Sequence, residues 1–235
     1  MAGIPFPPGI TNNDIKGFGS SALAALDPTT NLIIKFPFVT TESTKCDHER
    51  EIYERLERSS HPRPPSILNF HGTTPHGILL EYAPHRTLRH YLRDLDTPAP
   101  ISMILRWADQ AAEGLQFLHE NGICHGDVDC SKFFVTEDLN VKVGGFTRST
   151  EATSDGLKKD IVDFGSAVYY MVTGYMPYQG LGGEEREEMF RKHEFPDLMD
   201  VELKAVIFPC WAGSYEGFGG VVGDVRGYGR FLGVV

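Results

Sequence analysis

The order of the expected elements predicts an α+β fold with two lobes and a cleft between them. Strand signals dominate the first third of the chain, and long apolar helix patterns follow. Strands grouped before helices are typical of folds that segregate a sheet from a helical layer. The 235 residues, 41% of them hydrophobic and 23% charged, have the composition of an ordinary globular protein.

The strand signals are short runs of apolar and β-branched residues bounded by turn residues. The run Leu32–Phe36 is an example, and Pro37 ends it because proline cannot donate to a sheet. A turn containing Pro75 joins two further runs. The expected strands are residues 32–36, 67–70, 77–82, 133–135 and 141–143.

The helix signals are apolar residues at a spacing of three or four. Ile52 and Leu56 lie one turn apart in the first expected helix, where Glu51 and Arg55 form an i,i+4 pair. The second keeps the 3.6-residue period over about five turns, and Gly174 ends the third. The expected helices are residues 46–58, 101–118 and 161–173.

These elements divide the chain into four segments. Residues 1–9 are proline-rich and are expected to form a flexible arm. Residues 10–82 form a β-rich N-lobe, and residues 83–212 form a mainly helical C-lobe. Residues 213–235 contain eight glycines, and we expect a disordered tail there.

Charge and cysteine content exclude several classes of function. A net charge of −10 argues against binding to nucleic acid or to an anionic membrane. The start of the chain lacks a signal peptide, and no run of roughly 18 apolar residues could span a membrane. The four cysteines lack paired or zinc-type spacing. We therefore expect a protein of the cytoplasm or nucleus.

The most informative motif is His125-Gly126-Asp127, followed by Lys132 and by Gly145-Phe146-Thr147. The catalytic loop of protein kinases reads His-Arg-Asp, then four residues and Asn, with Asp-Phe-Gly further along. The chain thus resembles the protein kinase superfamily over residues 17–211. The likeness is greatest to tyrosine-kinase-like domains and to kinase-like proteins of filamentous fungi, through residues 107–115 and Cys210-Trp211.

The resemblance implies a two-lobed protein kinase-like fold with a nucleotide site between the lobes. Gly17, Gly19 and Ala22 match the glycine-rich loop that covers the phosphates of ATP, with Ala22 in place of the third glycine. The backbones of Glu81 and Ala83 match the hinge that offers an acceptor and a donor to adenine.

Lys35 stands where the family has its phosphate-binding lysine, and Glu49 is its expected partner on the following helix. Glu51 is the rival partner if the helix register differs by half a turn. Asp127 occupies the position of the catalytic base. Asp160 matches the buried aspartate that braces the catalytic loop.

Two departures concern the metal. The family holds Mg²⁺ with the Asn and the Asp that are here Lys132 and Gly145, so an oxygen ligand is missing at both positions. Magnesium is therefore not an expected cofactor, whereas ATP remains a candidate. The two exchanges add two positive charges, which equals the charge of one Mg²⁺. Either Lys132 contacts the nucleotide phosphates without a metal, or it points to solvent.

Two further departures concern the substrate and the C-lobe. Gly126 replaces the arginine that pairs with a phosphorylated activation loop. Only residues 146–159 separate Gly145 from Asp160, and an Ala-Pro-Glu motif is missing. Beyond Trp211 the family's final helices are not recognisable, so the C-lobe is expected to be truncated.

Three functions are therefore open. The first is a catalytically impaired pseudokinase that binds a nucleotide weakly or without metal, and binds or regulates another protein through its lobe surfaces. The second is a weakly active, atypical ATP-dependent Ser/Thr/Tyr kinase. The third is a truncated product without function.

Overall fold

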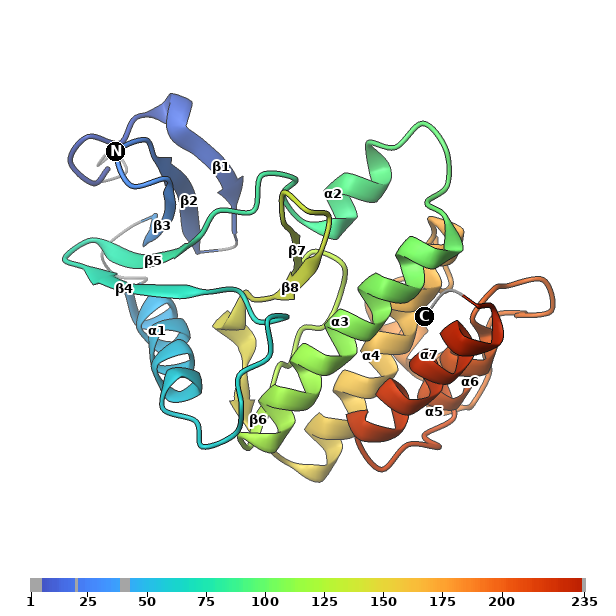
Figure 1. Cartoon of the computed structure of the whole chain (residues 1–235). Helices are drawn as coiled ribbons and strands as arrows, with labels where there is room; N and C mark the ends of the chain where they lie inside the picture. The colour runs from blue at the N-terminus through green and yellow to red at the C-terminus, as the bar shows by residue number, and fades with distance from the viewer. Residues whose placement is uncertain (1–5, 20, 39–42, 234–235) are drawn as a thin grey trace.

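The chain forms two lobes, with the strands of the N-lobe on one side and the helices of the C-lobe on the other (Figure 1). The computed structural model describes residues 6–19, 21–38 and 43–233. This arrangement confirms the expected α+β architecture and the order of its lobes.

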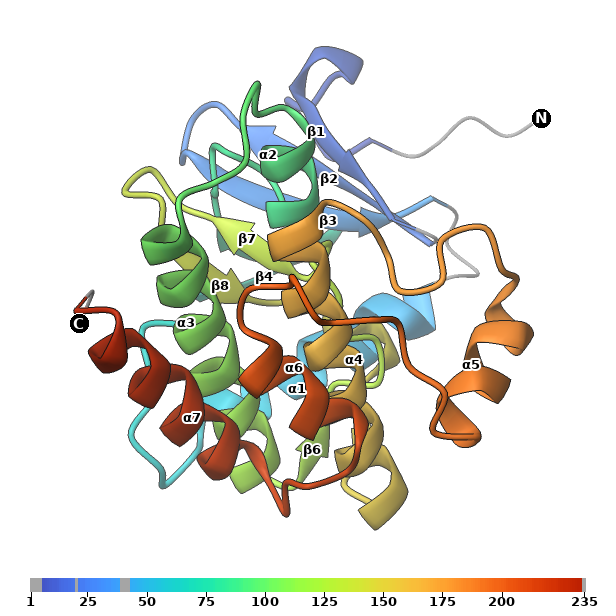
Figure 2. The same ribbon diagram turned by 90° about the vertical axis from the view of Figure 1, so that its right-hand side faces the viewer.

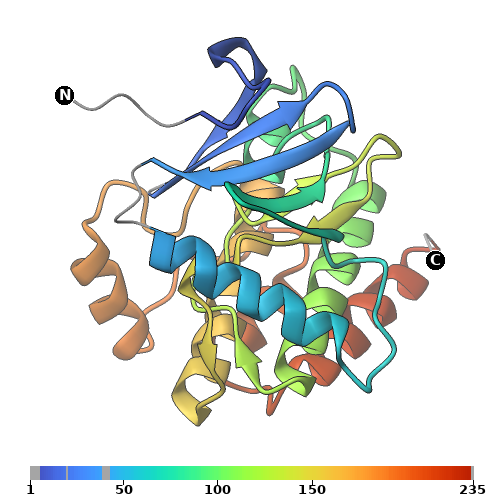
Figure 3. The same cartoon turned by 90° about the vertical axis from the view of Figure 1, so that its left-hand side faces the viewer.

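The N-lobe is built on an antiparallel five-stranded sheet with the strand order β1-β2-β3-β5-β4. Its register places Lys35 beside Ala24 and Ile33 beside Leu80. Helix α1 lies below the sheet, between it and the C-lobe (Figure 3). The elements are η1 Asn12–Asp14, β1 Ile15–Phe18, β2 Ala22–Asp27, β3 Leu32–Pro37, α1 Ser43–Glu57, β4 Phe70–Thr74 and β5 Gly77–Glu81.

The C-lobe packs its helices around α3, which contacts α4 and α7, while α6 packs against α4 (Figure 2). Its helices are α2 Leu88–Arg93, α3 Ile101–Glu120, α4 Ser154–Thr173, α5 Gly183–Arg191, α6 Lys204–Trp211 and α7 Phe218–Phe231, with the short η3 Phe146–Arg148. Its strands are β6 Ile123–Cys124, β7 Phe133–Val135, β8 Val141–Val143 and β9 Thr150–Glu151. None of the described helices combines the length and the apolar character that a membrane crossing requires.

One apolar core runs through both lobes. It joins Ile33 and Leu80 of the sheet to Leu105 and Leu115 of α3. Gly114 allows α3 to approach β8 closely, because a methyl group there would lie 2.6 Å from the Cγ2 of Val143. Burial of this apolar surface holds the two lobes together.

The longest elements match the sequence prediction closely. Helix α3 begins at Ile101, and α4 ends where Gly174 adopts a left-handed conformation at φ 76°. Strands β7 and β8 have the expected bounds. Periodicity and a glycine cap are local signals, so they predict these elements without knowledge of the packing.

The strand expected at residues 67–70 is wrong in its bounds, because β4 begins only at Phe70. Leu68 donates its N–H to the carbonyl of Val143 at 2.9 Å, and Ile67 makes a parallel bridge to the same residue. This segment thus joins the C-lobe hairpin. Helix α4 also begins earlier than expected, at Ser154, after Thr153 caps it by accepting from the N–H of Gly156.

The prediction of a disordered tail at residues 213–235 is wrong for most of that segment. Phe218, Val221, Val222 and Val225 are buried on one face of α7, at the spacing i, i+3, i+4, i+7. The Phe218 ring packs edge-on against Phe164 at 5.5 Å. The glycines between these residues concealed a regular amphipathic pattern.

The expected flexible arm, residues 1–9, is wrong where the structure describes it. The ring of Phe6 packs 5.8 Å from that of Phe36, and Pro7 accepts a hydrogen bond from the N–H of Ile10 at 3.1 Å. Phe6 therefore packs against the apolar cluster that contains Leu23 and Phe36 of the sheet, and the first five residues lie outside the described part.

Candidate nucleotide site

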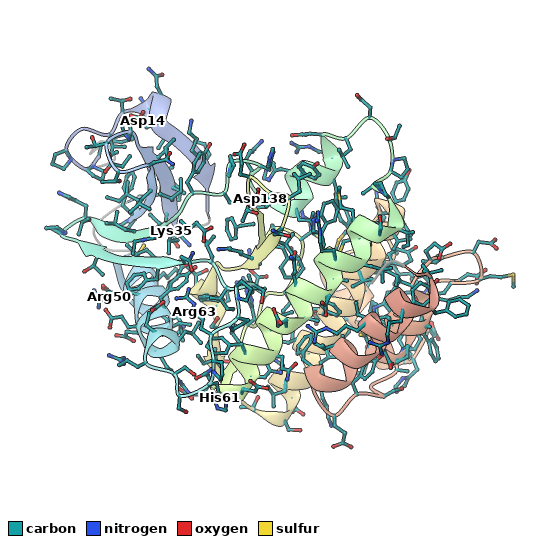
Figure 4. All side chains as sticks on the ribbon, in the orientation of Figure 1. Asp14, Lys35, Arg50, His61, Arg63 and Asp138 are labelled. Carbon is teal, nitrogen blue, oxygen red and sulfur yellow. The ribbon has the colours of Figure 1, made fainter. Side chains whose placement is uncertain are left out.

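The ammonium of Lys35 forms an ion pair with the carboxylate of Glu49, as the sequence predicted. Lys35 lies on β3 and Glu49 on α1; Figure 4 labels Lys35 on the sheet above this helix. Glu49 is fully buried, and its other oxygen accepts the N–H of Phe146 at 3.2 Å. The rival Glu51 is exposed. The pair therefore fixes the position of the Lys35 ammonium.

A stack of rings joins the N-lobe to the catalytic loop. The Tyr53 ring of α1 lies 5.5 Å from Phe70 of β4 and 4.8 Å from Phe146. Phe146 in turn contacts the ring of His125 edge-on at 5.6 Å. Phe146 and His125 thus link the two lobes, and contacts of this kind add to the stability that burial provides.

The catalytic loop is braced by Asp160, the buried aspartate at which the sequence placed this role. Its carboxylate accepts the N–H of His125 at 2.7 Å and that of Gly126 at 2.9 Å. His119 also contacts it, at 3.0 Å. Burial lowers the pKa of His125, which keeps that ring neutral beside the carbonyl of Gly144. The backbone before Asp127 is therefore held rigidly.

Two cations flank the carboxylate of Asp127. The Lys132 ammonium lies 3.0 Å from Oδ2, and the Arg148 guanidinium lies 3.8 Å from Oδ1. Lys132 also donates to the hydroxyl of Ser131 at 3.2 Å, and its side chain is 22% exposed. Lys132 thus faces Asp127, the residue in the catalytic-base position. The expectation that Lys132 points to solvent does not agree with this contact.

The Lys132 side chain also lies over Gly145. A methyl group at Gly145 would be 3.2 Å from Lys132 Cδ, which is tighter than an ordinary contact. Magnesium prefers six oxygen ligands in octahedral geometry. Asp127 offers a carboxylate that already pairs with an ammonium, and positions 132 and 145 offer no side-chain oxygen. This donor set does not fit a magnesium ion.

Gly126 explains how Arg148 reaches the catalytic loop. Gly126 has φ +75°, and a Cβ there would lie 2.5 Å from the carbonyl oxygen of Arg148. Only glycine combines this left-handed conformation with such a close backbone approach. The family's arginine at this position is therefore incompatible with the observed path of the chain after Phe146.

The glycine-rich segment forms a tight hairpin between β1 and β2. Gly19 donates its N–H to the carbonyl of Ala22 at 2.8 Å, and Gly17 pairs with Ala24. Ala22 is buried within β2. Its methyl group therefore packs within the N-lobe.

Glu81 and Ala83 lie where β5 leads into the C-lobe. The Glu81 carboxylate pairs with Lys142 of β8 at 2.7 Å and accepts the N–H of Asn69 at 3.2 Å. The carbonyl of buried Ala83 accepts the N–H of Arg86 at 3.0 Å. The side chain of Glu81 thus ties the hinge to the C-lobe hairpin.

Comparison with known proteins agrees with this geometry. The sequence profile of the family described as "Protein tyrosine and serine/threonine kinase" matches residues 24–160, which is more than half of the chain.

The chain belongs to the protein kinase family. The match includes Lys35, Glu49 and Asp127, the residues that form the ion pair and occupy the base position.

Curated kinases are similar over parts of the chain. Mouse A-Raf, a serine/threonine-protein kinase, is 25% identical over 153 residues, which cover 52% of this chain and 25% of A-Raf. A probable serine/threonine-protein kinase of Clostridium acetobutylicum is 27% identical over 195 residues, covering 69% of this chain and 29% of that protein. The chain spans about a quarter of the length of these relatives.

The sequence did not predict the contacts of three basic residues of this kinase domain, Arg55, His48 and Arg148. Arg55 pairs with Glu151 at 2.6 Å rather than with a neighbour on its own helix, and it donates to the carbonyl of Asn121 at 2.6 Å. His48 contacts the carbonyl of Ser149 at 2.7 Å. With the Arg148 contact, these interactions hold the activation segment against α1 and the catalytic loop. They join residues far apart in sequence, so spacing gave no signal for them.

Proposed function

We propose that this kinase domain binds a nucleotide in the interlobe cleft without a magnesium ion, that its capacity for phosphate transfer is impaired, and that it acts as a binding or allosteric module. The observation that carries the proposal is the Lys132 ammonium 3.0 Å from Asp127. It supplies positive charge where the family holds a metal ion.

The proposed site retains Lys35, the lysine at the family's phosphate-binding position. Glu49 orients Lys35, and the contact of Glu49 with Phe146 ties that orientation to the C-lobe. In the family this lysine contacts the α- and β-phosphates. Lys35 and Lys132 together offer two ammonium groups to a phosphate chain, and such charge-assisted contacts are among the stronger polar interactions.

Impaired transfer follows from the surroundings of Asp127. A general base must accept a proton from the substrate hydroxyl. Here one oxygen of Asp127 already faces an ammonium, and the other faces a guanidinium. Loss of metal-assisted charge stabilisation removes a further large catalytic contribution. The short segment between Gly145 and Ser154 also offers little surface for a peptide substrate.

A weakly active ATP-dependent kinase is the second candidate, and a specific observation favours it. The Lys35–Glu49 pair and the ring stack through Phe146 are assembled, so the framework for transfer is in place. The third candidate, a truncated product without function, would lack a stable core. Cooperative thermal unfolding would speak against it, whereas a broad, non-cooperative transition would favour it.

An ATP-turnover assay separates the first two candidates. The purified chain is incubated with ATP and Mg²⁺, and ADP release is compared between the wild type and Asp127→Asn. The pseudokinase proposal predicts background turnover in both proteins. Magnesium-dependent turnover that Asp127→Asn abolishes would overturn it and establish a working kinase.

We also propose that the protein resides in the cytoplasm or nucleus. Cys124, Cys130 and Cys210 are buried thiols, and this state is typical of the reducing cytoplasm or nucleus.

A further inference from the structure

We infer that Arg148 binds the terminal phosphate of the nucleotide, so that the cleft selects a metal-free nucleoside triphosphate over the diphosphate. The inference rests on the proposed function and specifies the nucleotide as the metal-free triphosphate. It assigns a binding role to a residue outside the glycine-rich loop, the Lys35–Glu49 pair and the hinge.

The first argument is that the carboxylate of Asp127 binds two cations that could instead bind a phosphate. Lys132 and Arg148 approach its two oxygens, at 3.0 Å and 3.8 Å, so both cations converge on one carboxylate. A terminal phosphate carries more charge than a carboxylate and has more acceptor oxygens. The planar guanidinium group can donate to two oxygens of such a phosphate at once. A phosphate beside Asp127 would therefore take over both cations.

The second argument is the rigidity of the backbone that carries Arg148. The residue before η3 and the residue after it are both held: Gly145 lies against Lys132, and buried Ser149 donates its hydroxyl to the carbonyl of His125 at 3.3 Å. The close approach to Gly126 fixes the carbonyl of Arg148 itself. Only the side chain, which is 72% exposed, is free to turn toward a ligand.

The third argument is charge balance. Lys35 is matched by Glu49, so its pair is neutral. Lys132 and Arg148 share the single carboxylate of Asp127. The neighbouring carboxylate of Asp160 is buried and accepts the N–H groups of His125 and Gly126. The cation with the weakest pairing is therefore Arg148, whose side chain is 72% exposed and lies 3.8 Å from Asp127. A ligand with one more phosphate gains most from it.

The test is calorimetric titration in EDTA and low salt with ATP, ADP and AMP as ligands. Three proteins are compared with the wild type: Arg148→Gln, Asp127→Asn, and the control Arg58→Gln, which removes an exposed arginine at the end of α1. We expect Arg148→Gln to weaken ATP binding about 3- to 10-fold and to leave ADP binding unchanged. Asp127→Asn removes the competing carboxylate, so we expect it to strengthen ATP binding. The control should match the wild type.

Two results would overturn the inference alone: equal effects of Arg148→Gln on ATP and ADP, or weaker ATP binding by Asp127→Asn, in a wild type that binds ATP in EDTA. A wild type that fails to bind any of the three nucleotides would overturn the proposed function, and this inference with it. Since Arg148 is exposed, the melting temperature of its variant should match that of the wild type, and the titration then reports binding.

Discussion

The side chain of Lys132 lies over the α-carbon of Gly145, so close that a methyl group at position 145 would be 3.2 Å from Lys132 Cδ. The two departures from the kinase pattern are therefore one structural unit. Lys132 fills the space into which a side chain at position 145 would project, and its ammonium faces Asp127.

This unit predicts that neither exchange can be reversed alone. Gly145→Asp would place a carboxylate against Lys132, where it pairs with the ammonium instead of a metal. The double variant Lys132→Asn/Gly145→Asp removes that cation and restores two oxygen ligands. We expect magnesium to strengthen ATP binding about tenfold or more in the double variant only. Titrations with and without Mg²⁺ measure this, and an equal gain in Gly145→Asp would contradict it.

The buried Glu49 predicts a large loss of stability when its charge is removed. Glu49→Gln leaves the Lys35 ammonium without its partner in a site that is nearly closed to water. Breaking a buried ion pair costs about 3 kcal/mol. The exposed Glu51→Gln is the matched control on the same helix and should stay within about 0.5 kcal/mol of the wild type. Denaturant unfolding measures both, and equal losses would refute the assignment of Glu49.

Asp163 predicts a specific pH dependence of stability. Burial raises the pKa of Asp163 to about 6; Lys159 opposes the shift, and the carboxylates of Asp160 and Asp127 add to it. The ordinary pKa of an aspartate is 3.8, so between pH 3.8 and about 6 the folded chain holds more protons at Asp163 than the unfolded chain. Asp163 therefore adds stability as the pH falls from 7 toward 4.

The measurement compares the wild type with Asp163→Asn across this range. Relative to the variant, the wild type should gain on the order of 1 to 3 kcal/mol between pH 7 and pH 4. Asp155→Asn, which changes an exposed residue of the same helix, serves as the control. Parallel stability curves for the wild type and Asp163→Asn would rule out the raised pKa.

The exposed glycines of α7 predict stabilising substitutions. A methyl group at Gly219 or Gly223 would meet no atom within 4 Å. Because glycine costs about 0.5 to 1 kcal/mol relative to alanine within a helix, each change to alanine should raise the free energy of unfolding by that amount. At Gly220 the methyl group would lie 2.9 Å from Tyr215 Cδ1, so that variant should gain less or lose stability. Equal effects at all three positions would argue against the folded helix.

Local signals predicted much of the fold. The runs at residues 133–135 and 141–143 and the period from Ile101 onward depend on neighbouring residues only, so their bounds were close. The strand expected at residues 67–70 shifted because Leu68 bonds to distant Val143. Helix α2 spans only six residues, and α5 has only Met189 and Phe190 as apolar side chains, so neither gives a periodic signal over several turns.

The candidate site, too, could be predicted from the sequence only in part. Motif spacing located Lys35, Glu49 and Asp127 and exposed the exchange at Lys132, because the kinase pattern fixes these positions along the chain. The contacts around Asp127 depend on the direction of long side chains and on a backbone approach at Gly126. Neither can be read from spacing, so Arg148 was found only in three dimensions.

The most direct test of the account is calorimetric titration of the wild type and Lys132→Ala with ATP in EDTA, with Lys192→Ala, which changes the exposed residue that follows α5, as the control. We predict that the wild type and the control bind ATP without metal and that added Mg²⁺ does not strengthen binding. Lys132→Ala should bind about tenfold more weakly. Binding that appears only with Mg²⁺, or equal affinity of the wild type and Lys132→Ala in EDTA, would contradict the account.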